Sequence, residues 1–286
     1  MKNVFIITNT SCNQCCNYCY YNIGVEKKIN GLLNSDNLKK FLDCKVDKIS
    51  ITGGEPLINP DLFKYLKIAR KHTKKIVLST NGLLITRNLV KRLISNGINK
   101  FFVSLDQIDG EYHDKFRSNS KSSALAAIQI LLLNNCDVSV TSVITTKNIS
   151  KIFDLQRFCN NNNIKFWPQP VFIPAYNKKL CDLNLANIKK DKWKKIIEEI
   201  PENMINTKAA KFLLKYFELF IKADKSKYFD CGFGSDQMVI NVDGSIKACF
   251  HGPQLGNINN NKLSSWRWEK IRNNDCFSEA CFQYYL

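Results

Sequence analysis

Residues 48–72, KISITGGEPLINPDLFKYLKIARKH, contain in order a β-rich run, a turn with two glycines and an amphipathic stretch. The run at 48–52 predicts a short strand, because it is rich in β-branched residues. Asn59 followed by Pro60 predicts the start of a helix, with Asn59 as its N-cap. The apolar residues that follow recur at helical spacing on one face: Leu62, Tyr65, Leu66 and Ala69. This stretch therefore predicts one strand–helix unit.

The same unit recurs along the first part of the chain. Strands are predicted at 4–8, 48–52, 76–80, 101–105, 138–144 and 164–169. Helix signals follow each of the first five strands, including expected N-caps at Ser35 and Thr86. This alternation indicates parallel strands joined by right-handed crossovers. Since six strands are fewer than the eight of a closed barrel, we predict an α/β fold: an open, partial (β/α)6 barrel of the TIM-like kind.

The pattern changes after residue 174. Two stretches, 191–200 and 207–222, predict helices with no strand between them. From Cys231 onward the chain is rich in turns and cysteines. We therefore predict three parts: a barrel over residues 1–175, a helical connection over 176–230 and a small cysteine-rich C-terminal domain over 231–286.

The composition is that of a globular protein, with 286 residues, 44% hydrophobic and 11% aromatic. No apolar run approaches the ~18 residues of a membrane span, and residues 4–7 are too few for the apolar part of a secretory signal. We therefore expect a cytoplasmic protein without a membrane partner. Lys and Arg exceed Asp and Glu by 17, a surplus that suits nucleic acid, an acidic peptide or a phosphorylated substrate. Because the lysines are spread along the chain, we favour a solvated surface and do not expect nucleic-acid binding.

Twelve cysteines are the strongest feature of the composition, and in a reduced protein they indicate metal binding or catalysis. Four of them lie in CNQCCNYC, residues 12–19, directly after the first expected strand. Two C-x2-C pairs, Cys12 with Cys15 and Cys16 with Cys19, would suit a zinc ion. Cys12, Cys16 and Cys19 alone form C-x3-C-x2-C, which would hold a four-iron cluster and leave one iron open to a ligand. The spacing by itself leaves both alternatives open.

The turn Gly53-Gly54-Glu55-Pro56 follows one strand–helix unit later. Its glycines let the backbone approach a ligand closely, and its carboxylate can accept a hydrogen bond from an amine. Together with C-x3-C-x2-C, this turn resembles the radical S-adenosylmethionine (SAM) superfamily. The resemblance implies a [4Fe–4S] cluster whose open iron binds SAM. It implies that the cluster ligands are Cys12, Cys16 and Cys19. It also implies that Gly53, Gly54 and Glu55 contact the SAM amine.

Other polar and aromatic residues match weaker parts of the family pattern. Tyr18, just before the third cysteine of the motif, matches an aromatic residue that lies near the adenine. Ser79 and Asn81 end the third expected strand, where the family places polar SAM contacts. The resemblance therefore implies that these three residues contact the cofactor.

The stretch from Ser104 to Arg117 resembles the SLDG…HD..R segment of the family. It departs from the pattern at Gln107, which stands in place of the usual glycine. The resemblance implies that Ser104 and Arg117 contact the methionyl end of SAM and that Asp106 reaches the ribose.

A second group of cysteines lies near the C-terminus. Residues 239–245 predict a hairpin through Asp-Gly, between Cys231 and Cys249 of a C-x12-G-x4-C pattern. With Cys276 and Cys281, this part resembles the SPASM auxiliary-cluster domain or its shortened form, Twitch. The resemblance implies a second [4Fe–4S] cluster held by these four cysteines. The C-x4-C spacing of the last two is looser than the usual C-x2-C, and a structural zinc ion on the same thiols is the alternative.

Five cysteines remain outside both groups. Cys44, Cys136 and Cys159 are expected to act as small buried hydrophobic residues. Cys15 lies beside the cluster ligands and has no assigned role. Cys181 follows the sixth expected strand, where it is either inert or a catalytic residue that donates a hydrogen atom to a substrate radical.

The resemblance implies an oxidoreductase. A flavodoxin- or ferredoxin-type donor supplies an electron, and SAM is cleaved to methionine and a 5′-deoxyadenosyl radical that removes a hydrogen atom from the substrate. Most relatives with this tail modify peptides, and we expect oxidative modification of a peptide, with dehydrogenation or epimerisation of a sugar or aminocyclitol as the alternative. The first expected strand begins at residue 4, so we expect no fused leader-peptide-binding domain. RNA modification is a further alternative, as is a non-enzymatic metal-binding module, with which the GGEP turn conflicts.

Overall fold

The computed structural model describes residues 2–24, 28–109, 111–173, 177–221, 235–250 and 252–268. One nine-stranded sheet runs through the molecule in the order β6-β5-β4-β3-β2-β1-β7-β8-β9. The strands are β1 (Asn3–Ile7), β2 (Lys48–Thr52), β3 (Ile76–Thr80), β4 (Ile98–Ser104), β5 (Asp137–Ile144), β6 (Lys165–Pro170), β7 (Gln237–Ile240), β8 (Ser245–Lys247) and β9 (Gln254–Asn257). The helices are α1 (Ser35–Phe41), α2 (Leu62–His72), α3 (Arg87–Ser95), α4 (Tyr112–Phe116), α5 (Lys121–Leu133), α6 (Ile152–Asn161), α7 (Lys190–Glu198) and α8 (Lys208–Ile221). Short 3-10 helices lie at Pro56–Ile58, Ile149–Lys151, Cys181–Leu183, Leu185–Asn187 and Glu202–Met204.

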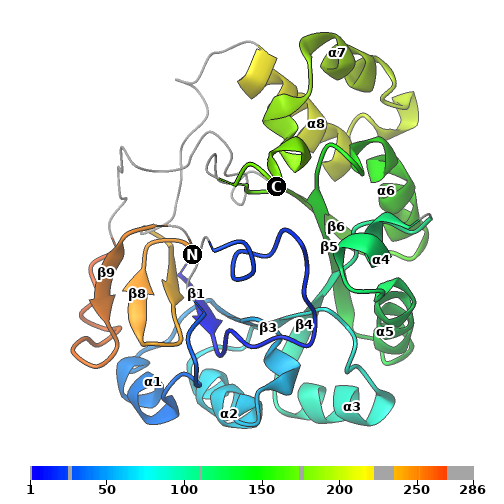
Figure 1. Cartoon of the computed structure of the whole chain (residues 1–286). Coiled ribbons are helices and arrows are strands. Elements are labelled where there is room, and N and C mark those ends of the chain that lie inside the picture. The colour runs from blue at the N-terminus through cyan, green and yellow to red at the C-terminus, as the bar shows by residue number, and fades with distance from the viewer. Residues whose placement is uncertain are drawn as a thin grey trace.

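The six strands β1 to β6 are parallel and lie side by side in chain order. Figure 1 shows the helices α1, α2, α3, α5 and α6 on the outer side of this curved sheet. The sheet ends at β6 on one side and β9 on the other, so it does not close. The prediction of an α/β fold with an open barrel of six parallel strands is confirmed.

The two faces of the sheet differ in their side chains. Ile49 and Ile51 of β2 and Phe101 and Val103 of β4 belong to one buried core with the apolar faces of the helices. Because successive side chains of a strand point to opposite faces, the residues that alternate with them point into the barrel interior. The outer face therefore holds the barrel together, and the inner face is left for function.

Two helices begin at other residues than the sequence predicts. The cap of α1 is Asn34, whose Oδ1 accepts a hydrogen bond from the backbone N of Asn37 at 2.9 Å, and Ser35 is already helical. Helix α2 begins at Leu62, and its N-cap is Asp61. The side chain of Asn59 holds the turn before the helix, because its Oδ1 accepts a hydrogen bond from Asp61 N at 2.9 Å, while its Nδ2 donates to the backbone O of Thr8 at 3.1 Å. Asn59 thus fastens the loop after β2 to the end of β1.

The predicted hairpin is present as β7 and β8, which are antiparallel. Gly244 in its turn has a φ of +80°, which glycine adopts without strain. Strand β7 also pairs in parallel with β1, from Asn3 with Gln237 to Ile6 with Ile240. The hairpin thus extends the barrel sheet, and the division of the chain near residues 175 and 231 stays a prediction.

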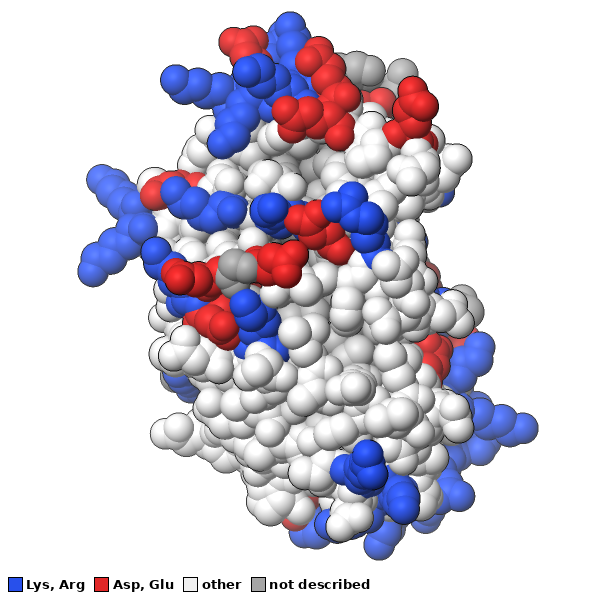
Figure 2. All heavy atoms as spheres, turned by 90° about the vertical axis from the view of Figure 1, so that its right-hand side faces the viewer, with Lys and Arg blue, Asp and Glu red and all other residues white. Residues whose placement is uncertain are grey.

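The face that carries α5 has a broad area without charged side chains, which Figure 2 shows. Residues 122–136 contain no Lys, Arg, Asp or Glu. Across the described ranges, no helix is both long enough and apolar enough to cross a membrane.

Candidate functional site

A pocket of about 500 Å³ lies where the parallel strands end. This volume suits a small-molecule cofactor or substrate. Except for Asp106, the residues predicted to bind the first cluster or SAM line it: Cys12, Cys16, Tyr18, Cys19, Gly53, Gly54, Glu55, Ser79, Asn81, Ser104 and Arg117. They come from the loops after β1 and β2, the ends of β3 and β4 and the segment after α4. The carboxyl ends of the strands thus gather residues that lie up to a hundred positions apart.

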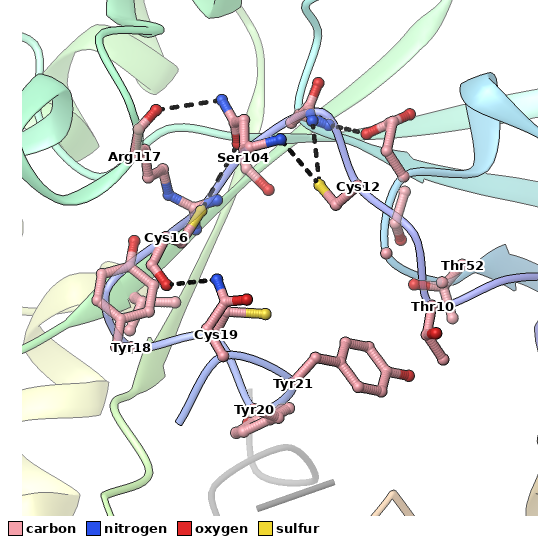
Figure 3. Close-up of a pocket in the computed structure, with 18 of the residues that line it drawn as sticks. Thr10, Cys12, Cys16, Tyr18, Cys19, Tyr20, Tyr21, Thr52, Ser104 and Arg117 are labelled. Atoms are coloured by element: carbon pink, nitrogen blue, oxygen red, sulfur yellow. Dashed lines mark hydrogen bonds between the residues drawn. The ribbon is translucent and has the colours of Figure 1, made fainter. Parts of the chain in front are cut away.

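The thiols of Cys12, Cys16 and Cys19 surround the same space, as Figure 3 shows. Burial raises the pKa of the Cys12 thiol and raises that of Cys16 to about 11, although the nearby Arg117 opposes the shift at Cys16. Such thiols are protonated until a metal displaces the proton. In the part of the chain that the structure describes, no three His, Cys, Asp or Glu side chains converge closely enough to hold a single ion. Three thiols around one pocket therefore fit a multi-iron cluster with one open iron better than a four-ligand zinc ion.

The two glycines of the GGEP turn allow the turn to lie against the cysteine loop. A Cβ on Gly54 would lie 2.1 Å from the backbone O of Ser11, and a Cβ on Gly53 would lie 2.5 Å from the backbone O of Asn9. Because neither glycine carries a Cβ, the two segments come close enough for Gly54 N to donate to Asn9 O at 2.8 Å and for Glu55 N to donate to Ser11 O at 2.9 Å. The close approach is therefore to the chain itself, and it positions the segment that leads into Cys12.

Glu55 is 1% exposed, and its carboxylate accepts three hydrogen bonds from the chain. Thr80 Oγ1 donates to Oε1 at 2.8 Å, Leu57 N donates to the same oxygen at 3.1 Å, and Asn81 N donates to Oε2 at 2.7 Å. Burial nevertheless raises the pKa of Glu55 to about 7. The carboxylate thus links the end of β2 to the end of β3. Its contact with the SAM amine stays a prediction.

Asp106 does not line the pocket; its side chain lies behind the wall and is fully buried. Its Oδ2 accepts hydrogen bonds from the Tyr18 hydroxyl and, at 2.6 Å, from Arg117 Nε. Its Oδ1 accepts hydrogen bonds from Val143 N at 2.8 Å and Arg117 Nη2 at 3.3 Å. All of these donors belong to the chain, so the carboxylate holds Tyr18 and Arg117 in the wall beside Cys16.

His113 contacts this network through the backbone of Asp106 and through Ser120. Its Nδ1 accepts a hydrogen bond from Asp106 N at 3.0 Å, and its Nε2 lies 3.0 Å from Ser120 Oγ. Since Ser120 Oγ donates to the backbone O of Arg117 at 2.7 Å, the proton of the His113 ring lies on Nε2. Burial lowers the pKa of His113 to about 4. The sequence shows the His113-Asp114 motif but not that His113 is a neutral bridge between Asp106 and Ser120.

We expect His113 to make the fold sensitive to acid. Its pKa is lower in the folded protein than the ordinary 6.5, so the unfolded chain takes up the proton first as the pH falls. The stabilisation is complete above pH 6.5 and is lost as the pH falls towards 4. Between pH 7.5 and 5.5 the free energy of unfolding should fall by about 1 kcal/mol more in the natural chain than in His113→Gln. Urea titrations of both proteins at the two pH values measure this difference. An equal fall in the free energy of unfolding in both proteins would contradict a neutral His113.

The remaining cysteines are less closely connected with the pocket. Cys181 is exposed, with its Sγ 3.1 Å from the backbone O of Lys178, and does not line the pocket. Cys159 is buried and Cys44 and Cys136 are half-buried, as small core residues would be. The hydrogen-donor role of Cys181 stays a prediction without a contact to support it.

The auxiliary-cluster prediction rests mainly on residues that the structure does not describe. Cys231, Cys276 and Cys281 all lie outside the described ranges. Cys249 is half-buried and packs with Phe250 against the small apolar cluster of Ile7, Val239 and Val242. This position places Cys249 beside β1 and β7.

The sequence is similar to curated relatives over about half of the chain. It is 31% identical over 136 residues to the AdoMet-dependent heme synthase of Methanosarcina barkeri, covering 44% of this chain and 39% of that protein. It is 30% identical over 148 residues to the mycofactocin maturase MftC of Mycobacterium tuberculosis, covering 50% and 37%. It is 29% identical over 167 residues to the GTP 3′,8-cyclase of Clostridium perfringens strain SM101, covering 54% and 50%. The chain therefore spans half or less of the length of these three relatives.

Solved structures share the fold over most of the chain. The enzyme anSMEcpe with bound AdoMet superposes with a TM-score of 0.69 at 20% identity, covering 92% of this chain and 79% of that one. Streptococcus suis SuiB bound to S-adenosylmethionine superposes with a TM-score of 0.70 at 14% identity, covering 94% and 65%. At these identities the likeness shows the fold alone. The family model described as the radical SAM superfamily matches residues 6–159, which is more than half of the chain. This match shows the family to which the chain belongs. The barrel that carries the three thiols and the GGEP turn is thus that of a SAM-dependent iron–sulfur enzyme, and the chain belongs to the radical SAM superfamily.

Proposed function

We propose that this chain oxidatively modifies a peptide by hydrogen-atom abstraction. One observation carries the proposal: a single pocket gathers Cys12, Cys16 and Cys19 with the Gly53-Gly54 turn. Cys12, Cys16 and Cys19 would hold a [4Fe–4S] cluster, which would supply the electron for cleaving SAM, and the 5′-deoxyadenosyl group so released would take the hydrogen atom from the substrate.

The pocket residues bind and orient the cofactor in this proposal. Ser79 and Asn81 at the end of β3 and Ser104 at the end of β4 present polar groups to SAM. Arg117 is 8% exposed, and Asp106 partly balances its charge, so it offers a positioned donor to the methionyl carboxylate. We propose that Asp106 acts through Tyr18 and Arg117 rather than on the ribose, because its carboxylate already accepts hydrogen bonds within the chain.

A peptide is favoured as the substrate by the rim of the pocket and by proteins of the same fold. Tyr20, Tyr21 and Phe172 line the pocket, and the rings of Tyr20 and Phe172 lie 6.2 Å apart. Aromatic side chains are enriched where proteins bind other chains. SuiB bound to the precursor peptide SuiA and anSMEcpe bound to AdoMet and a peptide share this fold.

The oxidative outcome is proposed from the tail. Four thiolates, from Cys231, Cys249, Cys276 and Cys281, would saturate a second four-iron cluster. A saturated cluster has no open iron for a substrate, so it suits electron transfer. A substrate that loses a hydrogen atom to the radical, and then an electron and a proton, is oxidised by two electrons overall.

Iron content and product mass test this proposal together. Anaerobically reconstituted protein should hold about eight irons per chain, and a Cys231→Ala/Cys249→Ala variant about half of that. The variant should still form 5′-deoxyadenosine with dithionite but should not complete turnover of a peptide pool. The natural protein should remove two hydrogens from the modified peptide.

Other results would contradict the proposal in specific ways. Epimerisation would leave the peptide mass unchanged in ordinary water. In heavy water the peptide would take up one deuterium, and Cys181→Ala would lose this uptake. Turnover of a sugar or aminocyclitol in place of any peptide would show the alternative substrate class. Four irons in both proteins would show that the tail holds no cluster.

A further inference from the structure

The interior face of the barrel carries lysines at the amino ends of its strands. In β2 and β4 the core residues point outward, so Lys48 and Lys100, which alternate with them, point inward. Ring contacts agree with this direction: Lys48 Nζ lies 5.9 Å from the Phe5 ring centroid, and Lys100 Nζ lies 5.2 Å from that of Phe102. Interior positions of a barrel are usually filled by bulky apolar side chains, so cations there indicate a use other than packing.

Strand β6 adds a third lysine to this face. Lys165 alternates with the outward core residue Phe166 and lies two positions before Trp167. The rings of Trp167 and Phe102 lie 5.9 Å apart, which places both on the interior face. Lys208, at the start of α8, approaches from the open side of the sheet, with its Nζ 4.9 Å from the Trp167 ring.

These lysines act on one another electrostatically. Burial, and then the charges of Lys100 and Lys75, lower the pKa of Lys48, while Asp236 opposes the shift. Burial and the charge of Lys165 lower the pKa of Lys100, against the attraction of Asp137 at 3.4 Å. Keeping like charges together in a partly desolvated place is unfavourable, and a bound anion would reverse this cost.

Two unpartnered polar groups lie on the same interior face. Ser139 of β5 is 0% exposed, pairs in register with Lys165, and its hydroxyl has no hydrogen-bond partner within the described ranges. The Nε1 of Trp167 is likewise buried and without a partner there. Buried polar groups are almost always hydrogen-bonded, and both of these can donate. An acceptor supplied by a ligand would satisfy them.

The lysines lie at the opposite end of the strands from the SAM pocket. Lys100 lies four positions before Ser104, which lines the pocket, a span of about 13 Å along the strand. We infer that Lys48, Lys100 and Lys165 form a subsite for an acidic group of the substrate on the interior face of the barrel. The inference rests on the proposed function and adds the substrate class: a peptide with a carboxylate or phosphate about four residues from the oxidised position.

Peptide binding to the reconstituted holoenzyme tests the subsite. The probe is a fluorescein-labelled tetraglutamate peptide, with tetraglutamine as its neutral counterpart, and the readout is fluorescence anisotropy. Lys48→Gln/Lys100→Gln should bind tetraglutamate about tenfold more weakly than the natural protein. Lys67→Gln/Lys91→Gln removes the same two charges from exposed positions on α2 and α3, and it should bind within about twofold of the natural protein. Circular dichroism confirms that both variants are folded.

Three outcomes would overturn the subsite: equal weakening in both double variants, equal binding of tetraglutamine, or no binding of tetraglutamate. Cleavage of SAM with dithionite is measured in the same natural holoenzyme. Cleavage without peptide binding would refute the subsite alone, whereas absence of cleavage would refute the proposed function. Adding a phosphoserine peptide as a second probe identifies which acidic group binds more tightly.

Discussion

Replacement of Cys16 by alanine should abolish the formation of 5′-deoxyadenosine. Cys16 is one of three thiols around the pocket, and Cys15, the remaining thiol of the same loop, is exposed and does not line this pocket. A cluster with one protein ligand fewer would not keep a single open iron for SAM. The measurement is 5′-deoxyadenosine produced anaerobically with dithionite, together with the iron content of the same sample.

Cys15→Ala is the matched control for this variant. Cys15 is exposed and absent from the pocket wall, and only its backbone N is held, by Ser118 Oγ at 3.0 Å. The Cys15→Ala variant should therefore bind as much iron as the natural protein and should still cleave SAM. Normal cleavage by Cys16→Ala, or its loss in Cys15→Ala, would mean that the loop uses another set of ligands.

Asp106→Asn should destabilise the fold by about 3–5 kcal/mol, because it leaves the Arg117 guanidinium buried without its counter-charge. The side chain of Asp106 is 0% exposed and that of Arg117 is 10% exposed. The amide keeps one acceptor oxygen but presents an NH2 donor in place of the other, so either Tyr18 and Arg117 Nε or Val143 N and Arg117 Nη2 lose their acceptor. Urea unfolding of the protein without metal, followed by circular dichroism, measures the loss.

The control is Asp154→Asn on α6, whose carboxylate pairs with Arg157 and Lys151 at the surface. Exposed pairs contribute about 0–1 kcal/mol, so this variant should remain close to the natural protein. If Asp106→Asn lost no more stability than Asp154→Asn, the buried pair would have no structural role.

The order and parallel pairing of β1 to β6 are predictable, because they depend on local features that recur along the chain. A β-rich run, a turn and an apolar helical stripe are each visible within about 25 residues, as in 48–72. The cysteine loop and the GGEP turn are each local motifs, and the resemblance to the radical SAM superfamily implies that their residues lie together.

Contacts between distant residues are what the sequence does not show. Asp106 meets Tyr18 across 88 positions, and Glu55 meets Asn81 across 26. Nothing near Asp106 in the sequence distinguishes a carboxylate that faces SAM from one that holds two wall residues. Asn59 is a similar case, since its Nδ2 donates to the backbone O of Thr8, 51 positions earlier, and no local pattern indicates this contact.

The pairing of β1 with β7 has a consequence for how the chain is made. Strand β1 has its neighbour on one side at residues 48–52 but its neighbour on the other side at residues 237–240. At about 5–20 residues per second, the second neighbour follows after roughly 10–50 s of synthesis. During that interval one edge of β1 is open to other chains, so a product that ends after β6 should aggregate more readily than the full chain.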